Sequence, residues 1–267
     1  MKRIMALLGK ELTDLRGNPA VFVPAIITGV ISIVMPFVIA IAVPYFSGER
    51  LADSSDFRVA LELYRDQPAT RSLDPEGAIQ AMIFQQFLIL LVLTPVAGAM
   101  SVVAYAVVGE KQARTLEPLL ATPLTTFELL AGKVLGALVP GIVLVTICFA
   151  LYVGGVALVA HPGVYRTLFF PRALLTIFLL GPLASLAALQ LAVCVSSRVN
   201  DARSAQQIGA LIILPISVLL VAEFTNNLQL TSRLVLLISS GLAALNVALM
   251  AVGIRLFDRE SILTRWK

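Results

Sequence analysis

The sequence predicts an all-α membrane protein with six transmembrane helices, and three observations lead to this fold class. The chain of 267 residues is 58% hydrophobic and 13% charged, with a mean hydropathy of +0.93, which is too apolar for a water-soluble domain. Six stretches of 19 or more residues contain no Lys, Arg, Asp or Glu, and about 20 apolar residues cross a bilayer as a helix. These runs are continuous, whereas a transmembrane β-barrel shows shorter, alternating segments.

The charged residues nearest to each stretch bound the expected spans within one membrane domain over residues 1–267. The spans are placed at residues 20–46, 80–108, 133–159, 173–196, 205–222 and 234–256. The first run is too long for the apolar region of a cleaved signal peptide, which has about 7 to 15 residues. Since the charges fall outside the apolar stretches, the deepest polar groups are expected to be neutral.

Basic residues set the expected orientation, because Lys and Arg are retained on the cytoplasmic side of a membrane. An even number of spans places both termini on one side, together with residues 109–133 and 197–204. That side holds 13 of the 20 Lys and Arg residues. We therefore expect both termini in the cytoplasm. The positive net charge is explained by this topology, and no nucleic-acid partner is expected.

Residues 2–16 carry five apolar side chains on one helical stripe, with Arg3, Lys10, Glu11 and Asp14 elsewhere. The stripe consists of Ile4, Leu7, Leu8, Leu12 and Leu15. Such a pattern predicts an amphipathic helix over residues 1–18 that lies on the inner membrane surface. The alternative is a charged flank that only stops the N-terminus from crossing.

The loop of residues 109–132 predicts a rigid helical elbow with two helix starts. Thr115 can cap a short helix with Glu117 and Pro118 in its first turn, and Thr125 with Glu128 forms a T-x-x-E capping box before the third span. Leucines on this elbow would face the cytoplasm, where no lipid covers them. The elbow is therefore suited to receive force from a partner protein.

The sequence resembles the ABC-2 type permeases, the membrane subunits of ATP-binding-cassette exporters. The resemblance rests on residues 109–111, 114–124, 128, 132–133, 196–198, 201–203, 205–206 and 257–260 together with the six-span layout. It implies that the elbow is a coupling helix that docks on a separate ATPase subunit. The implied contact residues are Glu110, Arg114, Thr115, Leu116, Glu117, Leu119, Leu120 and Pro123.

The resemblance further implies an exporter in the plasma (inner) membrane, with a second permease copy as a homodimer or related heterodimer and two ATPase copies. The sequence contains no G-x-x-x-x-G-K-[ST] phosphate loop, so ATP and Mg²⁺ are expected on the partner and this chain is not expected to be an enzyme. No catalytic residue and no metal site are expected, since Cys148 and Cys194 lack ligand spacing and His161 is the one histidine.

Four neutral polar side chains within the spans are candidates to line a transport path: Gln85, Gln86, Gln190 and Asn246. Hydrogen bonding between helices is the alternative role of such residues. Proline and glycine pairs such as Pro95 with Gly98, and Pro140 with Gly141, mark either hinges or static kinks.

A membrane scaffold or channel-like component without an ATPase is the alternative function. An intramembrane enzyme ranks last, because clustered catalytic residues are not seen.

Overall fold

The computed structural model describes residues 2–17, 22–54, 57, 61, 69–112, 125–196, 207, 210–225 and 230–256. All regular elements among these residues are helical. The predicted all-α fold class is therefore confirmed for the described part of the chain.

Within the described residues, five helices are long and apolar enough to cross a membrane, and each overlaps one predicted span. Two of them change to a π-helical turn partway along, at η2 (Val38–Ala42) and at η6 (Thr176–Leu180). The five are α2 (Val23–Phe37) with η2 and α3 (Val43–Ser47), α5 (Pro75–Gln112), α7 (Thr126–Val159), α8 (Pro171–Leu175) with η6 and α9 (Gly181–Ser196), and α12 (Ser232–Leu256).

The remaining predicted span, residues 205–222, is described from Ala210 onward apart from the lone residue 207. It forms the 3₁₀ turn η7 (Ala210–Ile212) and the helix α11 (Ile213–Phe224). The 12 residues of α11 are fewer than the approximately 20 that cross a bilayer as a helix. The count of six spans accordingly stays a prediction.

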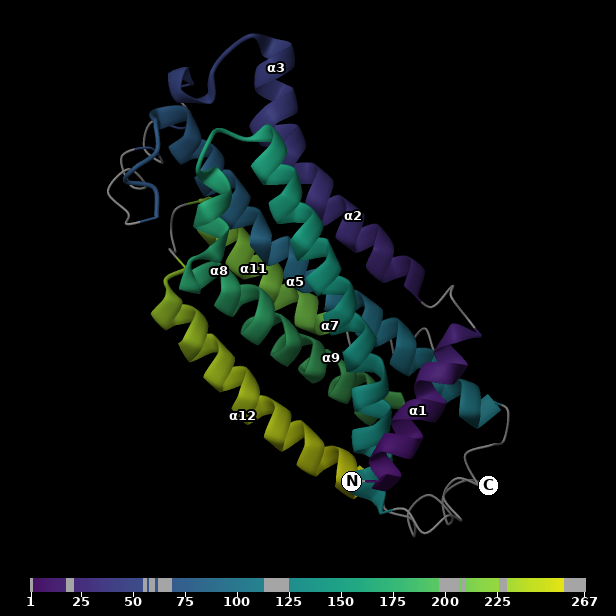
Figure 1. The fold of residues 1–267 in the computed structure, drawn as a ribbon. Coiled ribbons are helices and arrows are strands. Elements are labelled where there is room, and N and C mark those ends of the chain that lie inside the picture. Colours follow the sequence, from purple (N-terminus) through teal and green to yellow (C-terminus); the bar gives the residue numbers. More distant parts are fainter. Residues whose placement is uncertain are drawn as a thin grey trace.

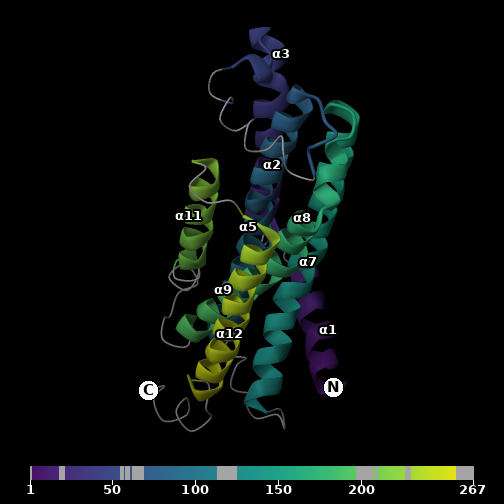
Figure 2. The ribbon, with the colours of Figure 1, turned by 90° about the vertical axis from the view of Figure 1, so that its left-hand side faces the viewer.

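Helix α5 lies at the centre of the bundle and packs against α2, α7, α9 and α11 (Figures 1 and 2). In its most apolar segment 83% of the residues are buried, against 17–28% in α2, α7 and α12. The peripheral helices thus leave broad apolar faces uncovered, as expected for helices that contact lipid.

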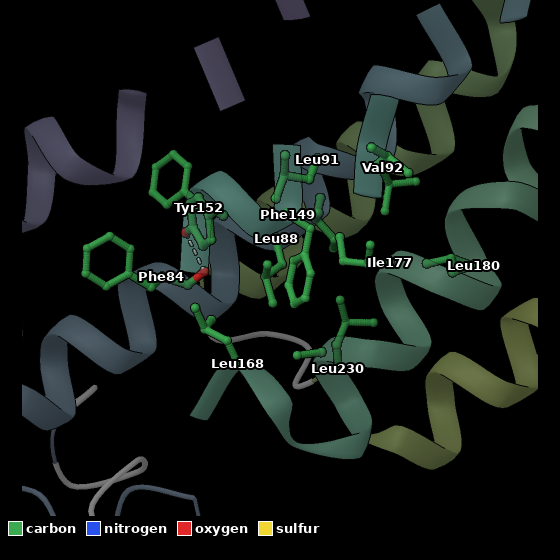
Figure 3. Packing of buried hydrophobic residues seen from close by; sticks show 14 of the residues in the cluster. Phe84, Leu88, Leu91, Val92, Phe149, Tyr152, Leu168, Ile177, Leu180 and Leu230 are labelled. Atoms are coloured by element: carbon green, nitrogen blue, oxygen red, sulfur yellow. Dashed lines mark hydrogen bonds between the residues drawn. The ribbon is translucent and has the colours of Figure 1, made fainter. Parts of the chain in front are cut away.

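The core around α5 combines aromatic and aliphatic side chains (Figure 3). Tyr152 on α7 is fully buried, and its hydroxyl donates a hydrogen bond of 2.8 Å to the main-chain oxygen of Phe84 on α5. The Phe37 ring on α2 contacts the rings of Phe84 and Tyr152, with centroid distances of 5.1 and 5.9 Å respectively. The hydrogen bond from the Tyr152 hydroxyl supplies the partner that a buried phenol requires, and it fixes α7 against α5.

We call the end of the bundle that carries α1 (Lys2–Arg16) the proximal end and the opposite end the distal end (Figures 1 and 2). The predicted capping box that opens α7 is confirmed at the proximal end. The Thr125 hydroxyl accepts from the Glu128 N–H at 3.2 Å, and the Glu128 carboxylate accepts from the Thr125 N–H at 2.9 Å. Because this box starts the helix early, α7 begins seven residues before the expected span.

Residues 2–16 form the helix predicted for them, but one assignment on it is wrong. Glu11 is 4% exposed and lies on the buried face between Leu7 and Leu15, rather than away from the apolar stripe. That face packs against α7, where Lys133 gives Glu11 a charged partner. The apolar stripe of α1 therefore contacts protein over at least part of its length.

Candidate functional site

Four polar side chains from three helices meet in the distal half of the bundle. They are Gln85 and Gln86 of α5, Arg172 of α8 and Glu223 of α11. Arg172 donates from Nη2 to Glu223 Oε1 and from Nη1 to Gln85 Oε1, the latter at 3.4 Å. The Glu223 side chain is 2% exposed and that of Arg172 is 17% exposed. A buried charge needs such a partner, because taking an isolated ion out of water costs several kcal/mol. Removing one partner of a buried pair therefore destabilises a protein by about 3–5 kcal/mol.

The two glutamines extend this ion pair into a network. Gln85 Nε2 donates to the main-chain oxygen of Thr167 in η5 (Val164–Phe169), and Gln86 Nε2 donates to the main-chain oxygen of Glu223, each at 3.4 Å. The network joins α5, η5, α8 and α11 across sequence separations of 51 to 137 residues. Gln85 and Gln86 therefore make hydrogen bonds between helices, which is the alternative role to lining a transport path.

One acceptor in this network has no hydrogen bond from any described residue. Glu223 Oε2 is buried and unpartnered, although Glu223 Oε1 is held by Arg172. Leaving a buried acceptor unsatisfied costs roughly 1–3 kcal/mol, more for a charged group. The position thus retains an unused capacity to accept a hydrogen bond.

A cavity of about 320 Å³ opens beside Arg172 and Gln85. Ligand sites in proteins commonly have volumes of about 300–1,000 Å³ and combine apolar walls with a few polar groups. The lining has this mixed character. It consists of Ala69, Gln85, Thr167, Phe170, Pro171, Arg172, Ala173, Leu230, Thr231 and Ser232.

Gln190 and Asn246, the other two candidates for a transport path, lie apart from this cluster. Asn246 Nδ2 on α12 donates to the main-chain oxygen of Leu183 on α9 at 3.0 Å. Gln190 lines a space of about 10 Å³ between α7, α9 and α12. Each amide oxygen is buried without a partner among the described residues. The structure thus separates Gln190 and Asn246 from Gln85 and Gln86, and the role of all four in a path stays a prediction.

The predicted ATPase contact region is only partly within the described residues. Glu110 lies on α5, two residues before that helix ends at Gln112. Arg114, Thr115, Leu116, Glu117, Leu119, Leu120 and Pro123 lie outside the described residues.

Both sides of that region are structured, and α1 braces one of them. Lys133 on α7 is 4% exposed, and its Nζ lies 3.3 Å from Glu11 Oε1 on α1. Two glycines of α7 allow this approach: a Cβ at Gly136 would lie 2.7 Å from Glu11 Cβ, and one at Gly132 would lie 2.4 Å from Leu7 Cδ2. The glycines and the buried ion pair therefore fix α1 across the start of α7.

In the sequence, Arg172, Glu223 and Lys133 stand at the ends of apolar stretches, and nothing there shows that these three charged side chains are paired inside the structure. A usable signal was present for the distal pair. Arg172 and Glu223 have opposite charges. Arg172 directly precedes the predicted span 173–196 and Glu223 directly follows the predicted span 205–222, so both are expected on the same side of the membrane. Their proximity still depends on how α8 and α11 pack around α5. Among the described residues, no three His, Cys, Asp or Glu side chains gather as a metal site would require.

The fold and these polar groups define a multi-pass helical membrane protein in which two charged pairs, Glu11–Lys133 and Arg172–Glu223, are largely buried between helices. Residues 65–251, more than two thirds of the chain, match the family described as ABC-2 family transporter protein. The chain belongs to this family. Its members are permeases that are typically non-enzymatic membrane subunits and work with an ABC ATPase. No curated protein matches the sequence.

Proposed function

We propose that this chain is the permease subunit of an ATP-driven exporter and that a separate ATPase docks on the elbow of residues 109–132. In this proposal six spans cross the plasma (inner) membrane, with both termini in the cytoplasm. Two permease copies, identical or related, pair with two ATPase subunits that bind ATP and Mg²⁺. Closure of the ATPase pair then switches the spans from inward to outward access.

The observation that carries the proposal is the braced proximal end. The elbow connects α5, which continues to Gln112, to α7, which begins at a complete capping box. The buried pair Glu11–Lys133 then ties α7 to α1. A loop that only reversed the chain would need no such support, whereas a docking element must pass force to the helices without bending.

Helix α5 offers a direct route from the elbow to the distal cavity. Its 38 residues extend over about 57 Å at 1.5 Å per residue. The helix carries Glu110 near one end and Gln85 and Gln86 in its other half. Movement of the elbow along α5 would therefore shift both glutamines against Arg172 and Glu223.

The test is the double variant E117K/L119D, expressed with the ATPase subunit. Charge reversal and loss of an apolar anchor should abolish copurification of the ATPase and transport together, because hot-spot contacts of this kind carry most of the affinity of an interface. The control is E49K, which makes the same charge reversal at an exposed residue of the distal end. It should leave both unchanged.

Retention of ATPase binding and transport by E117K/L119D would overturn the docking assignment. If the unchanged chain copurifies with no ATPase at all, the alternative of a membrane scaffold or channel-like component replaces the exporter.

A further inference from the structure

A smaller apolar crevice lies next to the distal cavity along α5 and α12, the two helices that line both spaces. On α5, Ile89 lies one turn from Gln85 and lines the crevice. On α9 and α12 the crevice is lined by Ala184 and Leu242, which follow the cavity residues Ala173 and Ser232 along the chain, and both helical segments run toward the proximal end (Figure 1). A polar chamber is thus followed by an apolar one.

The cavity presents hydrogen-bond donors around a cation. Of its described lining residues, Arg172 is the one with a formal charge. A guanidinium has five N–H groups, and two of them are used by Glu223 and Gln85. Thr231 and Ser232 add hydroxyl groups to the wall. Glu223, which pairs with Arg172, is not among the lining residues. This arrangement favours an anion, which charge-assisted hydrogen bonds from arginine bind strongly.

The crevice has the opposite chemistry. Its lining is entirely apolar among the described residues, with α11 contributing Pro215, Ile216 and Leu219. Its free volume is about 70 Å³, less than half of the roughly 150 Å³ of a cavity that holds benzene, so it admits only part of a flexible hydrocarbon chain and no ring system. Each buried methylene contributes about 0.8 kcal/mol, so a chain in this crevice gains affinity with length.

We propose that these two chambers bind one single-chain amphiphile with an anionic headgroup, either a carboxylate or a phosphate. The headgroup lies against Arg172 and Gln85, and the hydrocarbon chain lies between α5, α9, α11 and α12. Glu223 acts as a positioning residue that orients the guanidinium. The inference rests on the proposed function insofar as it names the class of substrate that the permease exports.

Direct binding tests the site without the ATPase. The full chain is placed in nanodiscs of phosphatidylcholine, and binding of radiolabelled dodecanoate and dodecyl phosphate is measured against empty nanodiscs. Dodecanol and butyrate are the probes that lack the charge or the chain. We expect saturable binding of one or both twelve-carbon anions and at least about tenfold weaker binding of the other two. The two anions distinguish a carboxylate from a phosphate headgroup.

Two variants assign the binding to the two chambers. R172Q/E223Q replaces the ion pair by an amide pair, so that no charge is left buried alone, and it should weaken anion binding at least about tenfold. I238W fills the crevice and should reduce binding of dodecanoate. The matched control L237W places the same side chain at a neighbouring position that is 68% exposed, and its binding should be unchanged.

Equal binding of dodecanol and the anions, or unchanged binding by both R172Q/E223Q and I238W, would overturn the proposal. Copurification of the ATPase is measured on the same preparations. Anion binding without a copurifying ATPase refutes the exporter and retains the site, whereas ATPase copurification without anion binding refutes the site and retains the exporter.

Discussion

Arg172 and Glu223 show how a charge can be placed inside an apolar bundle. Each stands at the distal end of its helix, α8 and α11, where the Arg172 side chain contacts both the Glu223 carboxylate and Gln85 of α5. Coulomb attraction in a low dielectric offsets desolvation only while both partners are present. The same condition applies to Glu11 and Lys133 at the proximal end. Both pairs therefore make their helices depend on each other.

At the residue scale, we predict that R172M lowers the free energy of unfolding by about 3–5 kcal/mol, because Glu223 stays buried without its charged partner. R172Q/E223Q should recover most of this loss, since neither remaining group is charged. Thermal unfolding of the chain in nanodiscs measures both effects.

Arg233 provides the control for this prediction, because it is exposed near the start of α12. R233M should change the unfolding temperature little. A loss in R233M as large as that in R172M would show that any arginine at this end has the effect and that burial is not its cause.

At the scale of elements, two glycines decide where α1 can pack. Glycine weakens a helix interior by about 0.5–1 kcal/mol relative to alanine, so its presence in α7 requires another reason. Gly132 and Gly136 lie where Leu7 and Glu11 of α1 approach the α7 backbone. The close packing of α1 replaces the stability that these glycines cost the isolated helix.

We predict that G136A loosens α1, because the new Cβ would lie 2.7 Å from Glu11 Cβ, an atom fixed close to the α1 backbone. Trypsin should then cleave α1 at Lys10 or Arg16 several-fold faster in solubilised protein. G154A is the matched control on the same helix, since a Cβ there meets no atom within 4 Å. It should leave cleavage of α1 unchanged or slower, and equal acceleration in both variants would contradict the packing role of Gly136.

At the scale of the whole molecule, the proposed topology places both termini in the cytoplasm. It is based on the distribution of Lys and Arg, and it requires the two ends of the helical bundle to lie on opposite sides of the membrane. The described helices place α1 at one end of the bundle and residues 48–50 at the other (Figure 1). A membrane around the bundle would then separate these two sets of residues.

This topology predicts opposite labelling of two single cysteines introduced after replacement of Cys148 and Cys194. M5C lies on α1, where Met5 is 63% exposed, and E49C lies at the distal end. An impermeant maleimide added to intact cells should label E49C alone, and M5C should react only after the membrane is opened. Labelling of M5C from outside would reverse the assigned orientation.

Helix type and approximate span position could be predicted because they depend on local composition. Uncharged apolar runs longer than about 18 residues define helices that need a bilayer, and the Thr125–Glu128 capping box lies within four residues of chain. Span ends were less predictable. Helix α5 begins at Pro75, five residues before its expected span, because a helix can continue past the apolar run.

The sequence by itself determined the all-helical class, the family and the apolar stretches that a membrane would enclose, since each of these is encoded in neighbouring residues. Only the tertiary structure decided that Arg172 meets Glu223 and Gln85, that Lys133 meets Glu11, and that a cavity opens between α5, α8 and α12. These contacts join residues 51 to 122 positions apart. They arise from the packing of whole helices, which no local pattern of charge or hydropathy specifies.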